Sequence, residues 1–253
     1  MLCQTVYGQG QKFNIRAAQT YTHTKRVSRE CRRQTESYDR KLMSIVAYYL
    51  DVDAAQLATL KATPSLVWNI HSDPRFAKAS MIDNDKDWEI LSWLASPEKR
   101  AEKCHETAWK MAHKKDEDLK VSRDEFKNLV AMSAKELGCP PETKEADSLL
   151  KAIEGRGAKN ELEPALNFGL GAARVFRPDE VKLLAVSFEK FDLTALRKQF
   201  DRKEMARFEV GGMDWETEPD QVLEQFLVPF FEKVSNFYQR ASQLNHYVLV
   251  IYQ

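Results

Sequence analysis

Two apolar runs of strand length lie far apart in this 253-residue sequence, and they constrain the fold more than any other feature. The later run, residues 247–252, is apolar at every position, which is typical of a strand buried on both faces. Such a strand needs helices above and below it. The earlier run, residues 44–50, follows Met43 directly and is stopped by Asp51 and Asp53. We therefore predict that the two runs are neighbouring strands of one sheet, covered by amphipathic helices.

Helical periodicity dominates the sequence between these runs. Apolar residues recur every three to four positions across residues 217–242, and Pro229 should kink that helix. A second helix is predicted over residues 83–94, because carboxylates at its start favour the positive end of a helix dipole. A further strand is predicted over residues 172–176. This succession of strands and helices predicts an α/β fold on the border with α+β.

A helical insertion is predicted at about residues 97–150, within a domain that covers residues 43–253. The inserted segment is rich in Lys and Glu, and Ser122 with Glu125 forms a capping box that starts a helix. A partner helix over residues 101–113 would complete an αα-hairpin.

Residues 1–42 differ from the rest in composition. They hold nine basic residues against three acidic ones, and few large aliphatic residues. We expect a disordered extension without a core of its own, or a start codon assigned upstream of Met43. A nucleic-acid-binding arm is the alternative, but the segment lacks an alternation of aromatic and basic residues. Nucleic acid is therefore not expected as a partner except through these 42 residues.

Charge and hydropathy limit the cell compartments in which this protein is expected. The 38 basic and 38 acidic residues balance, so no net field attracts nucleic acid or an anionic membrane. No stretch approaches the roughly 18 apolar residues that cross a bilayer, and the N-terminus lacks the apolar segment of a signal peptide. We therefore expect a cytoplasmic protein with no membrane partner. In a reducing compartment, four cysteines without paired spacing predict free thiols: Cys3, Cys31, Cys104 and Cys139.

Short motifs in a fixed order suggest a family. They are residues 44–50, Asp85-Lys86-x-Trp88-x-x-Leu91, residues 171–181 around Arg174, residues 196–200 and residues 245–250. Together they resemble the YfbM-like family, a bacterial domain of unknown function (number 1877), over residues 43–253. The resemblance implies a three-layer α/β/α fold around a mixed sheet, and it implies no activity. Residues 95–97 depart from the Thr-Gly turn that usually follows the Trp-bearing helix in this family.

The sequence holds no complete metal-binding or cofactor-binding motif. Asp83, Asp85 and Asp87 resemble the start of a calcium loop, but Trp88 and Leu94 stand where glycine and a bidentate glutamate are needed. The cysteines and histidines match no zinc spacing, and the glycine-rich segment before residue 172 precedes a strand instead of following one. We therefore predict no metal and no cofactor.

Five residues remain as candidates for a site. Asp85, Lys86 and Trp88 would form a polar and aromatic cluster at the mouth of a cleft, or simply start a helix. Arg174 lies inside a predicted strand, where a permanent charge is costly unless it meets a carboxylate or binds an anion. His246, just before the last strand, could act as a general base or be structural.

The sequence favours binding over catalysis, because it holds no recognisable catalytic motif. The leading hypothesis is a non-catalytic binding or interaction protein, regulatory or immunity-like, with a protein partner. The alternative is a small hydrolase or transferase that acts on a nucleotide or other anionic substrate. There Arg174 and Lys86 would hold the anion, and Asp85 or His246 would act as acid or base. That alternative requires Arg174, Lys86 and His246 to lie within about one ligand's width.

Overall fold

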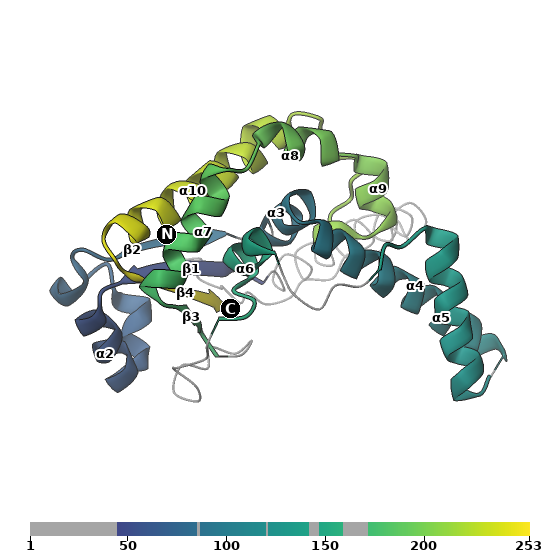
Figure 1. Ribbon diagram of the computed structural model, residues 1–253, viewed down its shortest axis with the longest axis horizontal. Helices are drawn as coiled ribbons and strands as arrows, with labels where there is room; N and C mark the ends of the chain where they lie inside the picture. The colour runs from purple at the N-terminus through teal and green to yellow at the C-terminus, as the bar shows by residue number, and fades with distance from the viewer. Residues whose placement is uncertain (1–44, 85–86, 120, 142–146, 159–171) are drawn as a thin grey trace, which may run out of the picture. The chain divides into compact units, whose positions relative to one another are not determined.

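A four-stranded sheet forms the centre of the fold. The computed structural model describes residues 45–84, 87–119, 121–141, 147–158 and 172–253. The strands are β1 (Ala47–Val52), β2 (Ser80–Asn84), β3 (Arg174–Phe176) and β4 (Tyr247–Tyr252), in the order β2-β1-β4-β3. Strands β1 and β4 therefore occupy the middle of the sheet, as Figure 1 shows.

The pairing of β1 with β4 confirms that the two apolar runs are neighbours. Ala47 lies opposite Tyr252, and Val52 lies opposite Tyr247. The expectation that the sheet mixes parallel and antiparallel strands is wrong, because every pairing in the described sheet is antiparallel. Each connection between neighbouring strands reverses the chain direction, so no parallel crossover unit forms.

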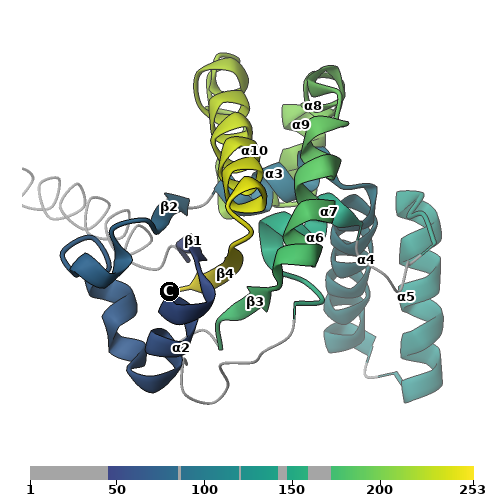
Figure 2. The same cartoon turned by 60° about the vertical axis from the view of Figure 1, so that its left-hand side comes forward.

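Helices cover both faces of the sheet and give it three layers. Figures 1 and 2 show α7 and α10 on one side of the strands and α2 on the other. The helices are α2 (Ala54–Ala62), α3 (Asp87–Ala95), α4 (Pro97–Leu119), α5 (Arg123–Leu137), α6 (Ser148–Glu154), α7 (Pro178–Glu189), α8 (Leu193–Gln199), α9 (Arg202–Arg207) and α10 (Val228–Gln243). This arrangement confirms the predicted class on the border between α/β and α+β.

Strand alternation divides the core into two parts. Tyr49, Val248 and Val250 point into the larger part, which α3, α6, α7 and α10 supply. Leu50 and Leu249 point to the opposite face, into a smaller core built with α2 and two 3-10 turns, Pro64–Asn69 and Pro74–Phe76. The successive residues of β4 therefore serve different cores, and this explains a strand that is apolar at every position.

Two predicted helix starts are corrected. Asp83 and Asn84 belong to β2, where Asn84 pairs with Ala47, so α3 begins only at Asp87. The helix predicted over residues 217–242 begins instead as a π-helical turn, Leu223–Leu227, before α10. Pro229 comes two residues after this π-helical turn, and the backbone before it is already helical, so its missing N–H removes one hydrogen bond from a continuous helix.

The predicted αα-hairpin is present. Helices α4 and α5 lie side by side in Figure 2, and α5 begins at the capping box of Ser122 and Glu125. None of the helices in the described ranges is both long and apolar enough to span a membrane.

Candidate functional site

Two of the residues selected from the sequence converge on a third. The ring centroids of Trp88 and Tyr252 are 5.1 Å apart, and Arg174 Cζ lies 5.0 Å from the centroid of the Tyr252 ring. All three side chains are half-buried. We call these three residues the Tyr252 site.

Three separate elements place these side chains. Tyr252 and Val250 lie on the same face of β4, and Arg174 of β3 pairs opposite Val250. Trp88 lies in the first turn of α3, and its Nε1 donates to the carbonyl oxygen of Ile45 at 3.1 Å. That hydrogen bond fixes the indole against the end of β4.

Arg174 binds a helix end instead of the carboxylate considered as its partner. Its Nη1 donates to the carbonyl oxygen of Glu154, the last residue of α6. No carboxylate of the described residues lies within ion-pair distance of Arg174. A cation at the C-terminal end of a helix is favoured by the helix dipole. A guanidinium carries five N–H donors, and this contact uses one of them.

Burial keeps Tyr252 a neutral phenol. Burial is the main cause that raises the pKa of Tyr252, and the nearby charge of Glu154 raises it further, while Arg174 and Arg156 act in the opposite direction. The buried hydroxyl has no hydrogen-bond partner of good geometry among the described residues. At neutral pH it is therefore a hydrogen-bond donor and not a base.

Asn84 adds a buried amide near this end of the sheet. It is 3% exposed and lies opposite Ala47, which in turn lies opposite Tyr252. Burial is the main cause that raises the pKa of the Tyr49 phenol, and the Asn84 side chain acts against it as a hydrogen-bonding neighbour. Asn84 therefore belongs to the polar groups buried at this end of the sheet.

His246 lies at the opposite end of β4. It precedes Tyr252 by six residues, which corresponds to about 20 Å along a strand. Its Nδ1 lies 3.8 Å from Oδ2 of the fully buried Asp51, which also binds Arg240. Arg174 pairs with Val250, so His246 and Arg174 are separated by about 13 Å along the sheet, too far to bind the same anionic group. Asp85 and Lys86, the other two candidates, lie outside the described residues.

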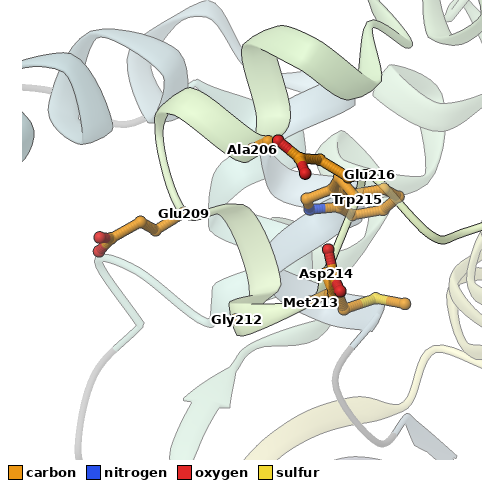
Figure 3. A pocket seen from close by; sticks show the side chains of 7 residues that line it. All are labelled: Ala206, Glu209, Gly212, Met213, Asp214, Trp215 and Glu216. Atoms are coloured by element: carbon orange, nitrogen blue, oxygen red, sulfur yellow. The ribbon is translucent and has the colours of Figure 1, made fainter.

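A cavity of about 420 Å³ lies elsewhere, beside α9 (Figure 3). Its lining includes the carboxylates of Glu209, Asp214 and Glu216, with Met213 and Trp215 among its apolar side chains. None of the described candidates, Trp88, Arg174 and His246, lines it. Since it offers carboxylates and no cation, it does not extend the anion-binding chemistry of the Tyr252 site.

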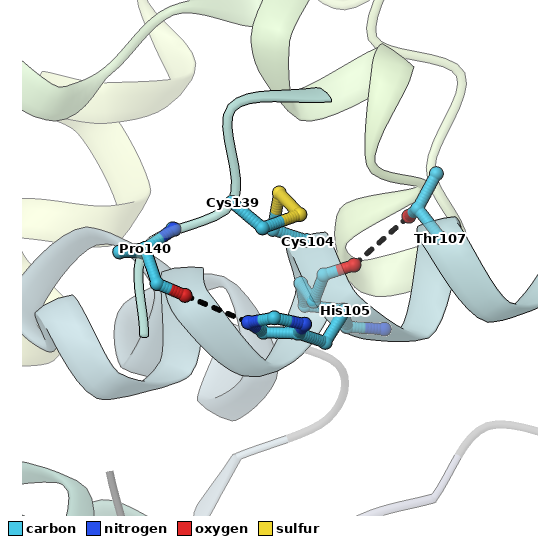
Figure 4. The surroundings of a disulfide bond; sticks show 6 residues. Cys104, His105, Thr107, Cys139 and Pro140 are labelled. Carbon is cyan, nitrogen blue, oxygen red and sulfur yellow. Dashed lines mark hydrogen bonds between the residues drawn. A yellow bond between two sulfur atoms is a disulfide. The ribbon is translucent and has the colours of Figure 1, made fainter. Parts of the chain in front are cut away.

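Cys104 and Cys139 correct a prediction. Cys104 and Cys139 were expected as free thiols, but they form a disulfide with a Cα–Cα distance of 5.4 Å (Figure 4). Antiparallel packing of α4 and α5 brings them together although they are 35 residues apart. Among the described residues, no group of three potential ligands could hold a metal ion.

Two carboxyl groups meet where α4 and α6 begin. Hydrogen bonding to Asp147 is the main cause that raises the pKa of Glu98. Burial acts to raise the pKa of Asp147, but hydrogen bonds from Glu98 and Ser96 outweigh it and lower that pKa. Asp147 also caps α6 by accepting from the Leu150 N–H at 2.7 Å. When one proton is bound by the pair, the directions of the two pKa shifts favour its position on Glu98.

Glu98→Gln is expected to stabilise the protein at pH 7 and to leave its stability unchanged near pH 4. A raised pKa contributes stability below the unfolded value, and that contribution is lost as pH rises through the folded value. The lowered pKa of Asp147 contributes stability above the unfolded value, and that contribution is lost as pH falls through the folded value. The Gln amide donates to Asp147 at every pH, and urea denaturation at pH 4, 5.5 and 7 measures the difference. Glu216→Gln, at an exposed position, is the control, and a less stable Glu98→Gln variant at pH 7 would contradict the position of the proton on Glu98.

The comparisons with known proteins give a family match to part of the chain and no activity. Residues 144–251 match the family model of a domain of unknown function, DUF1877, a range that contains Arg174 and nearly all of β4. The chain is similar in structure to YfbM from Escherichia coli, a protein of unknown function, with 16% identity and a TM-score of 0.49. That similarity covers 82% of this chain and 99% of YfbM. No curated protein matches the chain.

Proposed function

Residues 144–251 match the model of the YfbM-like family DUF1877. We propose that this chain is a non-catalytic binding protein. Its Tyr252 site would recognise an anionic group, such as a carboxylate, on a protein partner. The observation that carries this proposal is the position of Arg174 over Tyr252, where a backbone hydrogen bond to Glu154 holds it and no carboxylate of the described residues pairs with it.

The chemistry of these side chains suits a protein interface. Arginine binds carboxylates through two parallel hydrogen bonds, which are stronger than neutral ones. Tyr252 adds part of its half-buried ring, since its hydroxyl is buried, and Trp88 adds apolar area. Arginine, tyrosine and tryptophan are the residue types that contribute most to binding energy at interfaces.

Catalysis receives less support from the same residues. Tyr252 cannot act as a base at neutral pH, because its pKa is raised. The Glu154 carboxylate lies between Lys99 Nζ, at 2.9 Å, and Arg156 Nε, at 2.7 Å. The alternative, a hydrolase or transferase acting on an anionic substrate, would need its acid or base from Asp85, because His246 is buried, with its Nδ1 3.8 Å from Asp51 Oδ2.

Arg174→Gln is expected to abolish stable capture of the partner. The full-length chain, tagged, is incubated with native lysate at physiological salt, and the wild type should recover one partner in stoichiometric amount. Loss of a central interface arginine costs at least about 2 kcal/mol, or roughly 30-fold in affinity.

Matched variants separate binding from general charge effects. Arg123→Gln removes an equal charge from an exposed position on α5 and should leave capture unchanged. Arg174→Lys keeps the charge but loses the planar fork, so an intermediate recovery is expected. Failure of the wild type to recover a partner, or equal recovery by Arg174→Gln, would count against the proposal.

A further inference from the structure

We propose that Lys99 of the insert helix α4 positions the Arg174 guanidinium, and that it does so through Glu154. Lys99 is thus a positioning residue, and the insert supports the Tyr252 site instead of standing apart from it. This inference rests on the role proposed above for Arg174 as the anion-binding group.

Glu154 connects the insert to Arg174 through two different groups. Its carboxylate is bound by the insert, since Lys99 Nζ lies 2.9 Å from Oε1. Its carbonyl oxygen accepts the hydrogen bond from Arg174. The side chains of Lys99 and Glu154 are 7% and 6% exposed, so the pair is shielded from water. The end of α6 therefore lies where this ion pair holds it.

Gly155 makes the contact between α6 and Arg174 a close one. The residue adopts a φ of +62°, and a Cβ added there would lie 2.8 Å from Arg174 Cδ and 3.0 Å from Val250 Cβ. Only glycine allows the backbone to pass so near with this conformation. The end of α6 is packed closely against the Arg174 side chain. A movement of one must therefore move the other.

Lys99 carries this role more than Arg156 does. Arg156 also binds Glu154, with Nε 2.7 Å from Oε2, but its side chain is 34% exposed and it bonds Glu102 as well, at 2.5 Å. Without Lys99, the buried carboxylate would keep only a cation that lies nearer to solvent. A buried charge that loses its partner moves toward water or toward its other partner. Either movement would draw the end of α6 away from Arg174.

Chemical modification of Arg174 tests the proposal without any ligand. The full-length protein reacts with phenylglyoxal, and mass spectrometry of peptides gives the rate at Arg174 relative to the exposed Arg123. In the wild type Arg174 should react slowly, because Glu154 and Tyr252 hold it. Lys99→Met should raise the relative rate about fivefold, as expected for loss of one hydrogen bond. Lys99→Arg keeps a cation for Glu154 and should restore a rate near that of the wild type.

A matched variant on the same helix gives the control. Lys103 lies one turn further along α4, its side chain is 12% exposed, and it pairs with Glu89 and with Glu106. Lys103→Met therefore also breaks a shielded ion pair, but it should leave the relative rate at Arg174 unchanged. An equal increase in Lys103→Met, or no increase in folded Lys99→Met, would overturn the proposal.

A second variant covers the case in which Lys99→Met does not fold. The double variant Lys99→Met/Glu154→Gln removes both charges of the pair, so no buried charge remains unpaired at the Lys99 position. Arg174 should still react faster than in the wild type, because the end of α6 has lost its anchor. An unchanged rate would overturn the proposal. Since labelling needs no partner, faster labelling without partner capture would mean that only the proposed function fails.

Discussion

Replacing Cys104 and Cys139 by serine is expected to lower the free energy of unfolding by about 4 kcal/mol. The estimate comes from the chain entropy that a crosslink removes from the unfolded state, for two cysteines 35 residues apart. The disulfide joins α4 to the residue after the C-cap of α5. Its loss should release α5 first, because α5 packs chiefly on α4.

Urea denaturation of the variant, and of the wild type with and without dithiothreitol, measures this loss. The matched control is Cys3→Ser/Cys31→Ser, which removes the two cysteines outside the described residues. The control should match the wild type in both conditions. Equal stability of Cys104→Ser/Cys139→Ser and the wild type under oxidising conditions would contradict a structural role for the crosslink.

Asp51→Ala is expected to lower the free energy of unfolding by about 3 kcal/mol. Asp51 is fully buried in β1, accepts from the Ser80 N–H at 2.5 Å, and forms an ion pair with Arg240 of α10. Removing one partner of a buried pair costs roughly 3 to 5 kcal/mol. The lower end applies here, because the Arg240 side chain is 41% exposed and regains water.

Asp83→Ala is the matched control for Asp51→Ala. Asp83 lies on the neighbouring strand β2, is 71% exposed and pairs with Lys233 at 3.6 Å. An exposed pair of this kind contributes little, so its loss should hardly move the urea midpoint. If both variants lose the same free energy of unfolding, the ion pair between Asp51 of β1 and Arg240 of α10 does not explain the stability of this end of the sheet.

Hydrophobic pattern and capping chemistry predict much of the fold. The apolar runs alone predict β1 and β4 and their pairing, because no other segments can form the middle of a sheet. Ser122 with Glu125 predicts the start of α5, since this cap is a local contact. The direction of the strands cannot be predicted from this pattern. The pattern of β4 is equally apolar in a parallel or an antiparallel sheet, so the expected mixed sheet could not be tested from the sequence.

The site was only partly predictable, for a related reason. Arg174 stands out as a charge within an apolar strand, and Trp88 through a family motif. Tyr252, Asn84 and Glu154 carry no such signal, because their roles depend on neighbours far away in the sequence. The disulfide was missed for the same reason, since only the packing of α4 on α5 makes its two cysteines adjacent.

The central position of β4 has a consequence for synthesis on the ribosome. Tyr252 follows its partner Ala47 by more than 200 positions, and β4 is the last described element to be translated. At roughly 5 to 20 residues per second, β1 waits many seconds for that partner. During this interval β1 and β3 have no strand between them, and their apolar edges are open to other nascent chains. Chaperone demand should therefore be greatest before β4 has been synthesised.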